Sequence, residues 1–255
     1  MRNLSSKFGT RVTFIHAGNP SHDQKALFES HLEKYGFNES EYKIIFKRGG
    51  INNTINEIAE AEHIDLIVTG ALRREPLRKL YTGSVSRNLA RRAKIPVLLI
   101  PDAHLPIEPT LKIVIAINDE VPRRVIESGL HFARNTEGSK VFLVKESVLH
   151  GAKFGLSQYY ADYEIEKSHA ELVGCELGYL DEIMQYFDTD GIDIYKKVVF
   201  GHSGLAVVEF ANKIKADLMI DAFPDFRLGI LDRIFPHDVE YALQNLPCKL
   251  LLIKD

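Results

Sequence analysis

The stretch YKKVVFGHSGLAVVEFANKIKADLMIDA, residues 195–222, indicates the fold of this chain. Two short segments rich in Val, Ile and Leu enclose a segment whose apolar residues recur at helical spacing. The short segments show little alternation of polar and apolar residues, which is typical of strands with both faces covered. A second stretch of the same plan, YKIIFKRGGINNTINEIAEAEHIDLIVTG, occupies residues 42–70. The chain therefore repeats a strand–helix–strand unit of a parallel sheet.

Each repeat extends beyond this unit in the same way. An apolar strand precedes each unit and another follows it: RVTFIHAG (11–18) and IPVLLIP (95–101) in the first half, SKVFLVKE (139–146) and CKLLLI (248–253) in the second. We predict two doubly wound α/β domains, each built on a parallel five-stranded sheet flanked by helices. The proline-rich segment PDAHLPIEPT (101–110) is the expected linker, which gives domains of residues 1–106 and 107–255.

The two repeats differ at their start. The second begins with a strand and a helix, LKIVIAIN (111–118) and PRRVIESGLHFARNTE (122–137), that the first does not have. Gly9 matches Gly138, so the first repeat starts where that helix would end. We expect the first domain to lack its first, central strand, and we expect this chain to be a shortened form. The strands on either side of the missing one would then have unpaired backbone edges unless another strand fills the space.

Composition is that of an ordinary globular protein. Hydrophobic residues make up 45% of the chain and charged residues 26%, which excludes disordered, collagen-like and coiled-coil classes. The net charge of −3 argues against bulk nucleic-acid binding. Cys175 and Cys248 have neither disulfide-framework nor zinc-site spacing, and no apolar run is long enough for a signal peptide or a membrane span. We expect a soluble, cytoplasmic protein.

The segment GALRREPLRKLYTGSVSRNLARRAKIPVLLIP, residues 70–101, has glycines placed to hold a phosphate. Glycine lets the backbone approach a phosphate closely, and the free amides at the start of the following helix donate to it. The segment resembles the universal stress protein family, whose nucleotide-binding members carry Gly-x2-Gly-x9-Gly-(Ser/Thr) after the fourth strand. The resemblance covers both halves and implies a tandem universal stress protein.

The resemblance implies an ATP or anion site formed by Gly70, Arg73, Gly83, Ser84 and Val85. Arg73 stands where the family has its second glycine. An arginine can reach a phosphate but cannot give the same close backbone approach, so ATP binding is expected to be weakened without excluding an anion. Residues 71–94 carry eight Lys and Arg against Glu75, which either attract such an anion or form a solvated helix face.

The second half has lost these features. Ala222 stands at the position of the first glycine, and Pro236 and His237 stand at the position of the final Gly-Ser pair. Residues 222–247 carry two arginines against four carboxylates, which opposes polyphosphate binding. Asn118 occupies the place of the family's first-strand aspartate. We expect no nucleotide in this half.

The sequence gives little support for catalysis. GHSGL (201–205) has leucine where a nucleophile elbow needs its second glycine. Ser203 is therefore more simply interpreted as the N-cap of the helix that follows. Asn52 or Asn53 is the expected N-cap of the matching helix in the first half. The histidines show no spacing with carboxylates that would form a metal site. The aromatic-rich stretch 151–192 is longer than its counterpart in the first half and is either core or a protein-binding segment.

The predicted function is that of a non-catalytic stress-response or regulatory protein. Self-association is expected through the last strand of each repeat, residues 96–101 and 249–253. These strands are predicted to lie at sheet edges and to pair with one another across the two domains or with a second chain, because unpaired edges this apolar invite aggregation. One alternative is a cytoplasmic regulatory domain of a membrane cation transporter, which would bring the protein to a membrane only through that tether. A further alternative is an ATP-hydrolysing stress protein.

Overall fold

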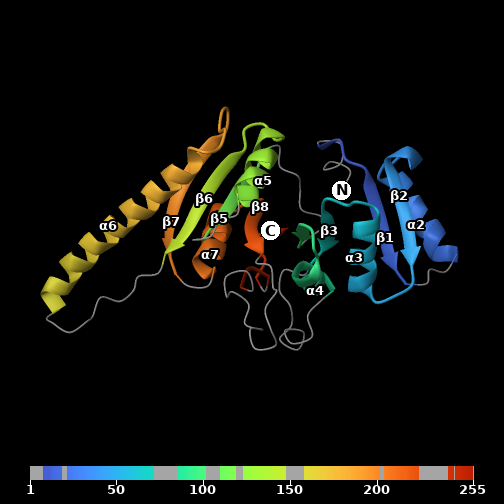
Figure 1. The fold of residues 1–255 in the computed structure, drawn as a ribbon, viewed down its shortest axis with the longest axis horizontal. Coiled ribbons are helices and arrows are strands. Elements are labelled where there is room, and N and C mark those ends of the chain that lie inside the picture. The colour runs from blue at the N-terminus through green and yellow to red at the C-terminus, as the bar shows by residue number, and fades with distance from the viewer. Residues whose placement is uncertain are drawn as a thin grey trace.

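A computed structural model of residues 1–255 describes residues 8–18, 22–71, 85–101, 110–118, 123–147, 158–201, 204–223, 241–243 and 245–254. For residues 22–24 and 158–168 only the backbone is described. The described strands form one seven-stranded sheet and one two-stranded sheet (Figure 1).

The seven-stranded sheet contains strands of both halves of the chain. Its order is β3-β4-β9-β8-β5-β6-β7, and its strands are β3 (Ile67–Gly70), β4 (Val97–Ile100), β5 (Lys112–Ile117), β6 (Lys140–Ser147), β7 (Asp193–Phe200), β8 (Leu218–Phe223) and β9 (Lys249–Lys254). All neighbours are parallel except β4 and β9, which run antiparallel. The predicted α/β class is confirmed, and each of these strands lies within two residues of its predicted place.

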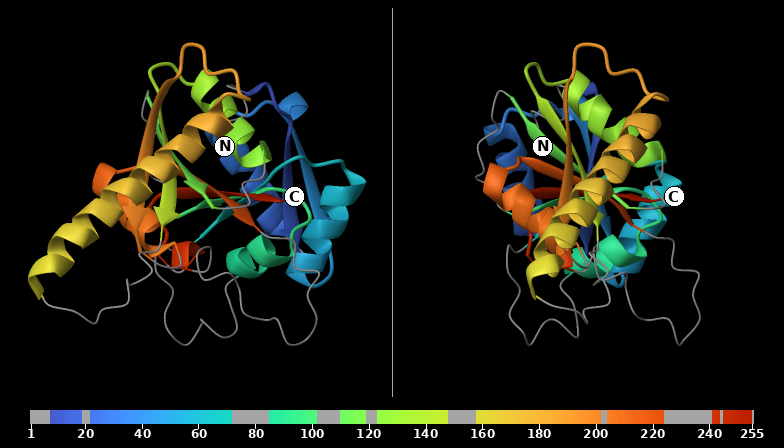
Figure 2. Two further views of the ribbon diagram at one scale, coloured as in Figure 1. Left: turned by 60° about the vertical axis from the view of Figure 1, so that its left-hand side comes forward. Right: turned by 90° about the vertical axis from the view of Figure 1, so that its left-hand side faces the viewer.

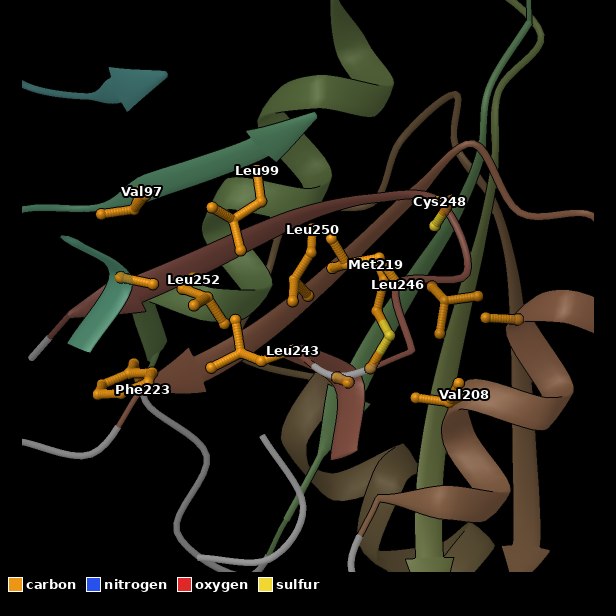
Figure 3. Close-up of a cluster of buried hydrophobic side chains, with 14 of the residues drawn as sticks. Val97, Leu99, Val208, Met219, Phe223, Leu243, Leu246, Cys248, Leu250 and Leu252 are labelled. Carbon is orange, nitrogen blue, oxygen red and sulfur yellow. The ribbon is translucent and has the colours of Figure 1, made fainter. Parts of the chain in front are cut away.

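The second half forms a five-stranded parallel unit with helices on both faces. Its helices are α5 (Arg123–Arg134), α6 (Gln158–Met184) and α7 (Leu205–Ile214). Side chains of α5 and α6 belong to one core cluster, whereas those of α7 belong to the other cluster together with α4 (Val85–Arg92). Figure 3 shows this second cluster, in which Leu99 of β4, Leu250 of β9 and Val208 of α7 converge. The strand residues alternate between the two cores, as a doubly covered sheet requires.

Gly129 allows the helix α5 to lie directly against the sheet. A Cβ added at this position would overlap the Cδ1 atom of Ile115 on β5 and would lie 2.8 Å from its Cγ1 atom. Ile115 is fully buried, so it has no free space into which it can move. The glycine is therefore required by close packing of α5 on β5.

The first half is divided between the two sheets. The strands β1 (Val12–Ala17) and β2 (Tyr42–Lys47) pair only with each other, and α2 (His22–Lys34) and the 3-10 turn η1 (Glu39–Glu41) connect them. This unit has its own small core around Val12, Leu32 and Phe37. Partial burial, followed by the charges of Glu39, Glu29 and Glu33, raises the pKa of the Tyr42 phenol. The helix α3 (Ile51–Ala61) then leads to β3 in the larger sheet.

The described part of the first half differs from the five-stranded sheet predicted for each domain. Its described strands number four, in two separate pairs, whereas the second half has the five expected strands. In the second half β5 lies between β8 and β6, and in the described part of the first half no strand lies between the equivalent strands β3 and β1. The expectation that the first domain lacks its central strand stays a prediction.

The last strand of each repeat joins the two halves, as predicted. The pairing of β4 with β9 places Val97 opposite Leu252 and Leu99 opposite Leu250. Both strands are also paired on their other edge, β4 with β3 and β9 with β8. Association of these strands is therefore internal to one chain, and association between chains stays a prediction. The predicted domain boundary at residue 106 falls outside the described residues.

The helix starts differ from those predicted. The N-cap of α7 is Gly204, in the left-handed conformation, and Ser203 lies outside the described residues. The N-cap of α3 is Gly50, so Asn52 and Asn53 lie in the first turn of the helix and are not caps. These caps were mispredicted because a glycine, which has no side chain of its own to cap with, occupies the N-cap position of both helices.

The aromatic-rich stretch 151–192 forms the long helix α6 over Gln158–Met184. Near its C-terminal end, Leu180 and Met184 are buried against the sheet, which supports the core interpretation for that end. The N-terminal end extends away from the sheet (Figure 2). Partner binding by this stretch stays a prediction.

Candidate anion site at the end of strand β3

The structure describes two of the five predicted site residues. Gly70 ends β3 and is exposed, and Val85 begins α4 and is exposed as well. Arg73, Gly83 and Ser84 lie outside the described residues. A Cβ added at Gly70 would meet no described atom within 4 Å, so packing in the described part of the chain does not require glycine there. A strand end without a covering side chain leaves room for another group to approach the backbone.

The equivalent strand end in the second half is filled by protein side chains. Ala222 corresponds to Gly70 in the repeat and is 8% exposed, and the next residue, Phe223, is 1% exposed. The ammonium group of Lys254 lies 3.3 Å from the centroid of the Phe223 ring, which is a buried cation–π contact. These side chains fill the strand end that Gly70 leaves open in the first half, and the absence of a nucleotide in the second half stays a prediction.

Lys254 also connects the two halves. Its Nζ atom donates a hydrogen bond to the carbonyl oxygen of Ala90 at 2.8 Å. Ala90 lies in the last turn of α4, where a cation is favoured by the carbonyl groups and by the helix dipole. The sequence analysis missed this role, although a lysine at the end of the apolar run CKLLLIK is an unusual feature that could have indicated it.

The basic segment 71–94 does not form a single solvated face. In its described part, Arg87 of α4 is only 2% exposed and lies in the buried layer together with Leu89 and Ala90. Arg92 and Lys94 are exposed, and Lys94 forms an ion pair with Glu60 at 3.4 Å. The interpretation of these cations as one solvated face is therefore wrong at Arg87, where the helix turns toward the core. Arg73 and its immediate neighbours stay untested.

A carboxylate from a neighbouring strand caps the helix α7. Glu146 on β6 accepts hydrogen bonds from the backbone amides of Gly204 at 2.7 Å and Ala206 at 3.0 Å. These amides are among the free donors at the start of the helix, where negative charge is favoured. A Cβ at Gly201 would lie 2.8 Å from Oε1 of Glu146, so a glycine at that position leaves space for the carboxylate. The anion-binding capacity of this helix start is thus used within the protein.

The first half has no counterpart to this carboxylate. In the repeat, Ala17 at the end of β1 corresponds to Glu146, and the α3 N-cap, Gly50, has no side chain. The sequence analysis missed the cap because Glu146 and Gly204 are separated by 58 positions. The two repeats have therefore diverged at two pairs of equivalent strand ends, those of β1 and β6 and those of β3 and β8.

The described residues carry no sign of a metal centre or of a membrane span. Across the described ranges, no group of three or more His, Cys, Asp or Glu side chains could hold a metal ion. Within the same ranges, no helix is long and apolar enough to cross a membrane.

Comparison with known proteins identifies the family of the first half. Residues 8–101 match the family model described as "Universal stress protein family". These residues form a universal stress protein domain. The chain is also 25% identical over 233 residues to the Universal stress protein E homolog of Haemophilus influenzae, an alignment that covers 88% of this chain and 73% of that protein. The likeness to universal stress proteins thus extends over both halves, and the recognition of a tandem member is confirmed.

Solved structures share the fold of this chain. A universal stress protein from Archaeoglobus fulgidus matches with a TM-score of 0.67 and 15% identity, and the match covers 98% of this chain and 88% of that one. A putative universal stress protein from Pseudomonas aeruginosa matches with a TM-score of 0.60 and 19% identity over 98% of this chain and 85% of that one. At these identities the comparison establishes the architecture alone.

Proposed function

We propose that this protein is a non-catalytic stress-response or regulatory module of the cytoplasm, in which only the first half binds a nucleotide or another phosphate anion, and binds it weakly. The observation that carries this proposal is the contrast between two equivalent strand ends. Gly70 at the end of β3 is exposed, whereas Ala222 and Phe223 at the end of β8 are buried and Lys254 lies over the Phe223 ring. An anion can approach the backbone at the first of these ends only.

The expected affinity is modest because the first half lacks part of the family's phosphate pattern. Arg73 replaces the second glycine, so a guanidinium contact substitutes for a close backbone contact. A charge-assisted hydrogen bond from an arginine is about twice as strong as a neutral one, but it holds the phosphate less closely than a backbone cradle does. Among the described residues no strand lies between β3 and β1, so they supply no neighbouring strand end to the site.

Several features support a regulatory role over a catalytic one. The described part holds no cluster of potential metal ligands, and the one sequence that resembles a nucleophile elbow, at 201–205, lacks the required glycine. The joined sheet gives the two halves a shared core cluster, through which we expect a change in one half to reach the packing of the other. A protein of this kind acts through its association with partners.

Calorimetric titration of the 255-residue protein with ATP, ADP and inorganic phosphate tests the proposal. We expect one weak site per chain, with at least fivefold weaker binding in the Arg73→Ala and Gly83→Val variants. Arg227→Ala, in the corresponding loop of the second half, is the matched control and should leave the affinity unchanged. ATP hydrolysis that disappears in Gly83→Val would contradict the non-catalytic role, and a loss of binding in Arg227→Ala would move the site to the second half.

A further inference from the structure

The strand β7 ends the seven-stranded sheet, and its outer edge is unpaired. The amide of Gly201 donates to the carbonyl oxygen of Ser147 on β6, which directs the peptide groups of the odd-numbered residues of β7 toward β6. The peptide groups of Ile194, Lys196 and Val198 therefore point outward. Within the described part of the chain, no strand pairs with this outer edge. Such an edge is a template for pairing with another strand.

The two faces of β7 differ at this edge. On one face the helix α6 covers the strand. There Ile194 packs against the core cluster that contains Leu180, and Lys196 forms an ion pair with Asp181. The side chains on the opposite face form an exposed row, which consists of Asp193, Tyr195 and Lys197.

Tyr195 lies at the middle of the exposed row and is held in place by stacking. Its ring lies 5.1 Å from that of Phe142 on β6, centroid to centroid, and the two ring planes are inclined by 19°. Phe142 in turn contacts the ring of Phe210 on α7. Tyr195 nevertheless stays 44% exposed. An aromatic side chain that is already ordered loses little conformational freedom on binding, so it suits the centre of a protein interface.

The charges of the exposed row have opposite signs on the two sides of Tyr195. Asp193 precedes Tyr195 by two positions and Lys197 follows it by two, so all three side chains share one face. Among the described residues, neither Asp193 nor Lys197 has an ion-pair partner. If two copies of β7 pair antiparallel about Tyr195, each Asp193 lies opposite Lys197 of the other copy. The exposed row is thus complementary to itself.

The backbone of β7 fits this register. Residues directly opposite each other in an antiparallel pair are either both turned toward the partner strand or both turned away from it. Two copies of one strand can therefore pair only about a residue that lies opposite itself. About Tyr195, the outward peptide groups of Ile194 exchange hydrogen bonds with those of Lys196 in the other copy. Tyr195 itself forms a non-hydrogen-bonded pair, in which opposite side chains approach most closely.

The neighbouring registers are less favourable. Pairing about Lys196 or Lys197 places two lysines directly opposite each other, which is destabilising. Pairing about Ile194 brings neither charge of the exposed row opposite a charge of the other sign. Registers closer to Phe200 bring the second strand toward α6, whose N-terminal end extends away from the sheet beyond the ring contact of His169 with Phe200 (Figure 2). The charges and the position of α6 therefore select the same register.

From these observations we infer that the outer edge of β7 binds the same edge of a second copy of this chain, antiparallel and centred on Tyr195. The sheet then continues from one copy into the other, and Asp193–Lys197 ion pairs flank the central tyrosines. The same patch serves both copies, as a two-fold interface requires. Exposed ion pairs add little affinity, so they set the register, while main-chain hydrogen bonds and the tyrosines hold the copies together. This interface differs from the β4–β9 pairing, which is internal to one chain.

Charge reversal tests this inference by analytical ultracentrifugation of the 255-residue protein over the micromolar range. We expect a reversible monomer–dimer equilibrium that weakens as salt is added. Asp193→Lys and Lys197→Asp each place like charges opposite each other, and each should raise the Kd of the dimer by at least about tenfold. The double variant Asp193→Lys/Lys197→Asp restores opposite charges in every pair and should return the Kd to within about threefold of the original. A mixture of the two single variants should form a heterodimer more tightly than either variant pairs with itself.

A second pair of variants tests the backbone. Lys196→Pro removes an outward donor without breaking a hydrogen bond between β6 and β7, and it should raise the Kd by at least about tenfold. The matched control is Lys196→Ala, which loses the same ion pair with Asp181 but keeps the amide. This control should leave the Kd within about threefold of the original.

A cysteine at the centre of the interface tests the register. Opposite residues of a non-hydrogen-bonded pair have Cα atoms about 4.5 Å apart, which is within disulfide range. Cys175 is exposed, so it is first replaced in a Cys175→Ser background. In that background Tyr195→Cys should form a disulfide-linked dimer on air oxidation. Lys213→Cys, at an exposed position of α7, is the control for random collision and should not.

Each outcome decides the inference. It is overturned if the protein stays monomeric, if the double charge variant dimerises no better than the single ones, or if Lys196→Pro and Lys196→Ala behave alike. It is also overturned if Tyr195→Cys and Lys213→Cys cross-link equally, or if a dimer forms that none of these variants changes, since the interface then lies elsewhere. The double charge variant and the mixture keep the test decisive where one substitution lowers stability, because a merely unfolded variant would not be rescued.

Discussion

Replacing Glu146 with alanine removes the carboxylate that accepts hydrogen bonds from Gly204 and Ala206 at the start of α7. The two amides then lose their partner in a half-buried position, where water replaces it incompletely. Loss of a capping side chain costs about 0.5–2 kcal/mol, and hydrogen bonds to charged groups contribute about 1.5–3 kcal/mol each. Because both bonds share one carboxylate and the site is partly hydrated, we expect a loss of about 2–3 kcal/mol in the free energy of unfolding.

Urea denaturation monitored by circular dichroism measures this loss. In a chain of this size, 1 kcal/mol corresponds to about 2–4 °C in melting temperature, so a thermal scan should show a decrease of about 4–12 °C. Glu146→Gln retains an uncharged oxygen acceptor and should lose about 1 kcal/mol. The matched control is Glu209→Ala, which removes an exposed carboxylate from the same helix and should change stability by less than about 0.5 kcal/mol. Equal losses in Glu146→Ala and Glu209→Ala would refute the capping role of Glu146.

Two further substitutions test the packing of the joined sheet. Gly129→Ala places a methyl group against the fully buried Ile115 and should destabilise the protein by about 1–3 kcal/mol in urea denaturation. The control is Gly174→Ala on α6, where a Cβ would meet no described atom within 4 Å, and it should be neutral or slightly stabilising. Equal effects of the two substitutions would contradict the close-packing argument. Lys254→Ala leaves the Ala90 carbonyl without its donor and should cost about 1–3 kcal/mol. Calorimetry should then show a broader or divided transition as the two halves uncouple, and an unchanged single transition would argue against Lys254 as a link between them.

Local patterns were sufficient to predict most of the secondary structure. The run DLMIDA predicted a buried strand at 217–222, and β8 occupies Leu218–Phe223. The segment LKIVIAIN predicted a strand at 111–118, and β5 occupies Lys112–Ile117. These predictions succeed because β-branched content and hydrophobic periodicity are properties of a few consecutive residues.

Predictions about individual side chains succeeded less often. Arg87 was counted among the cations that attract an anion or form a solvated face, yet it is buried in α4. The cap of α7 was assigned to a neighbouring serine, and the structure supplies it from Glu146 on another strand. Gly70 and Val85 lie at a strand end and a helix start as expected, but that placement does not establish that they bind a ligand. In each case the deciding partner is distant in sequence.

The sequence by itself determined the repeated α/β architecture, the order of its strands and helices, the family, and the loss of the glycine pattern in the second half. Only the tertiary structure decided how the two halves join and how the strands of the first half are divided between two sheets. The antiparallel pairing of β4 with β9 makes one seven-stranded sheet, while β1 and β2 stand apart as a pair. Local sequence specifies which residues form a strand and which faces are apolar, but a strand edge carries the same peptide groups in every sequence. Its partner is therefore fixed by which other edges the folded chain brings within hydrogen-bonding distance.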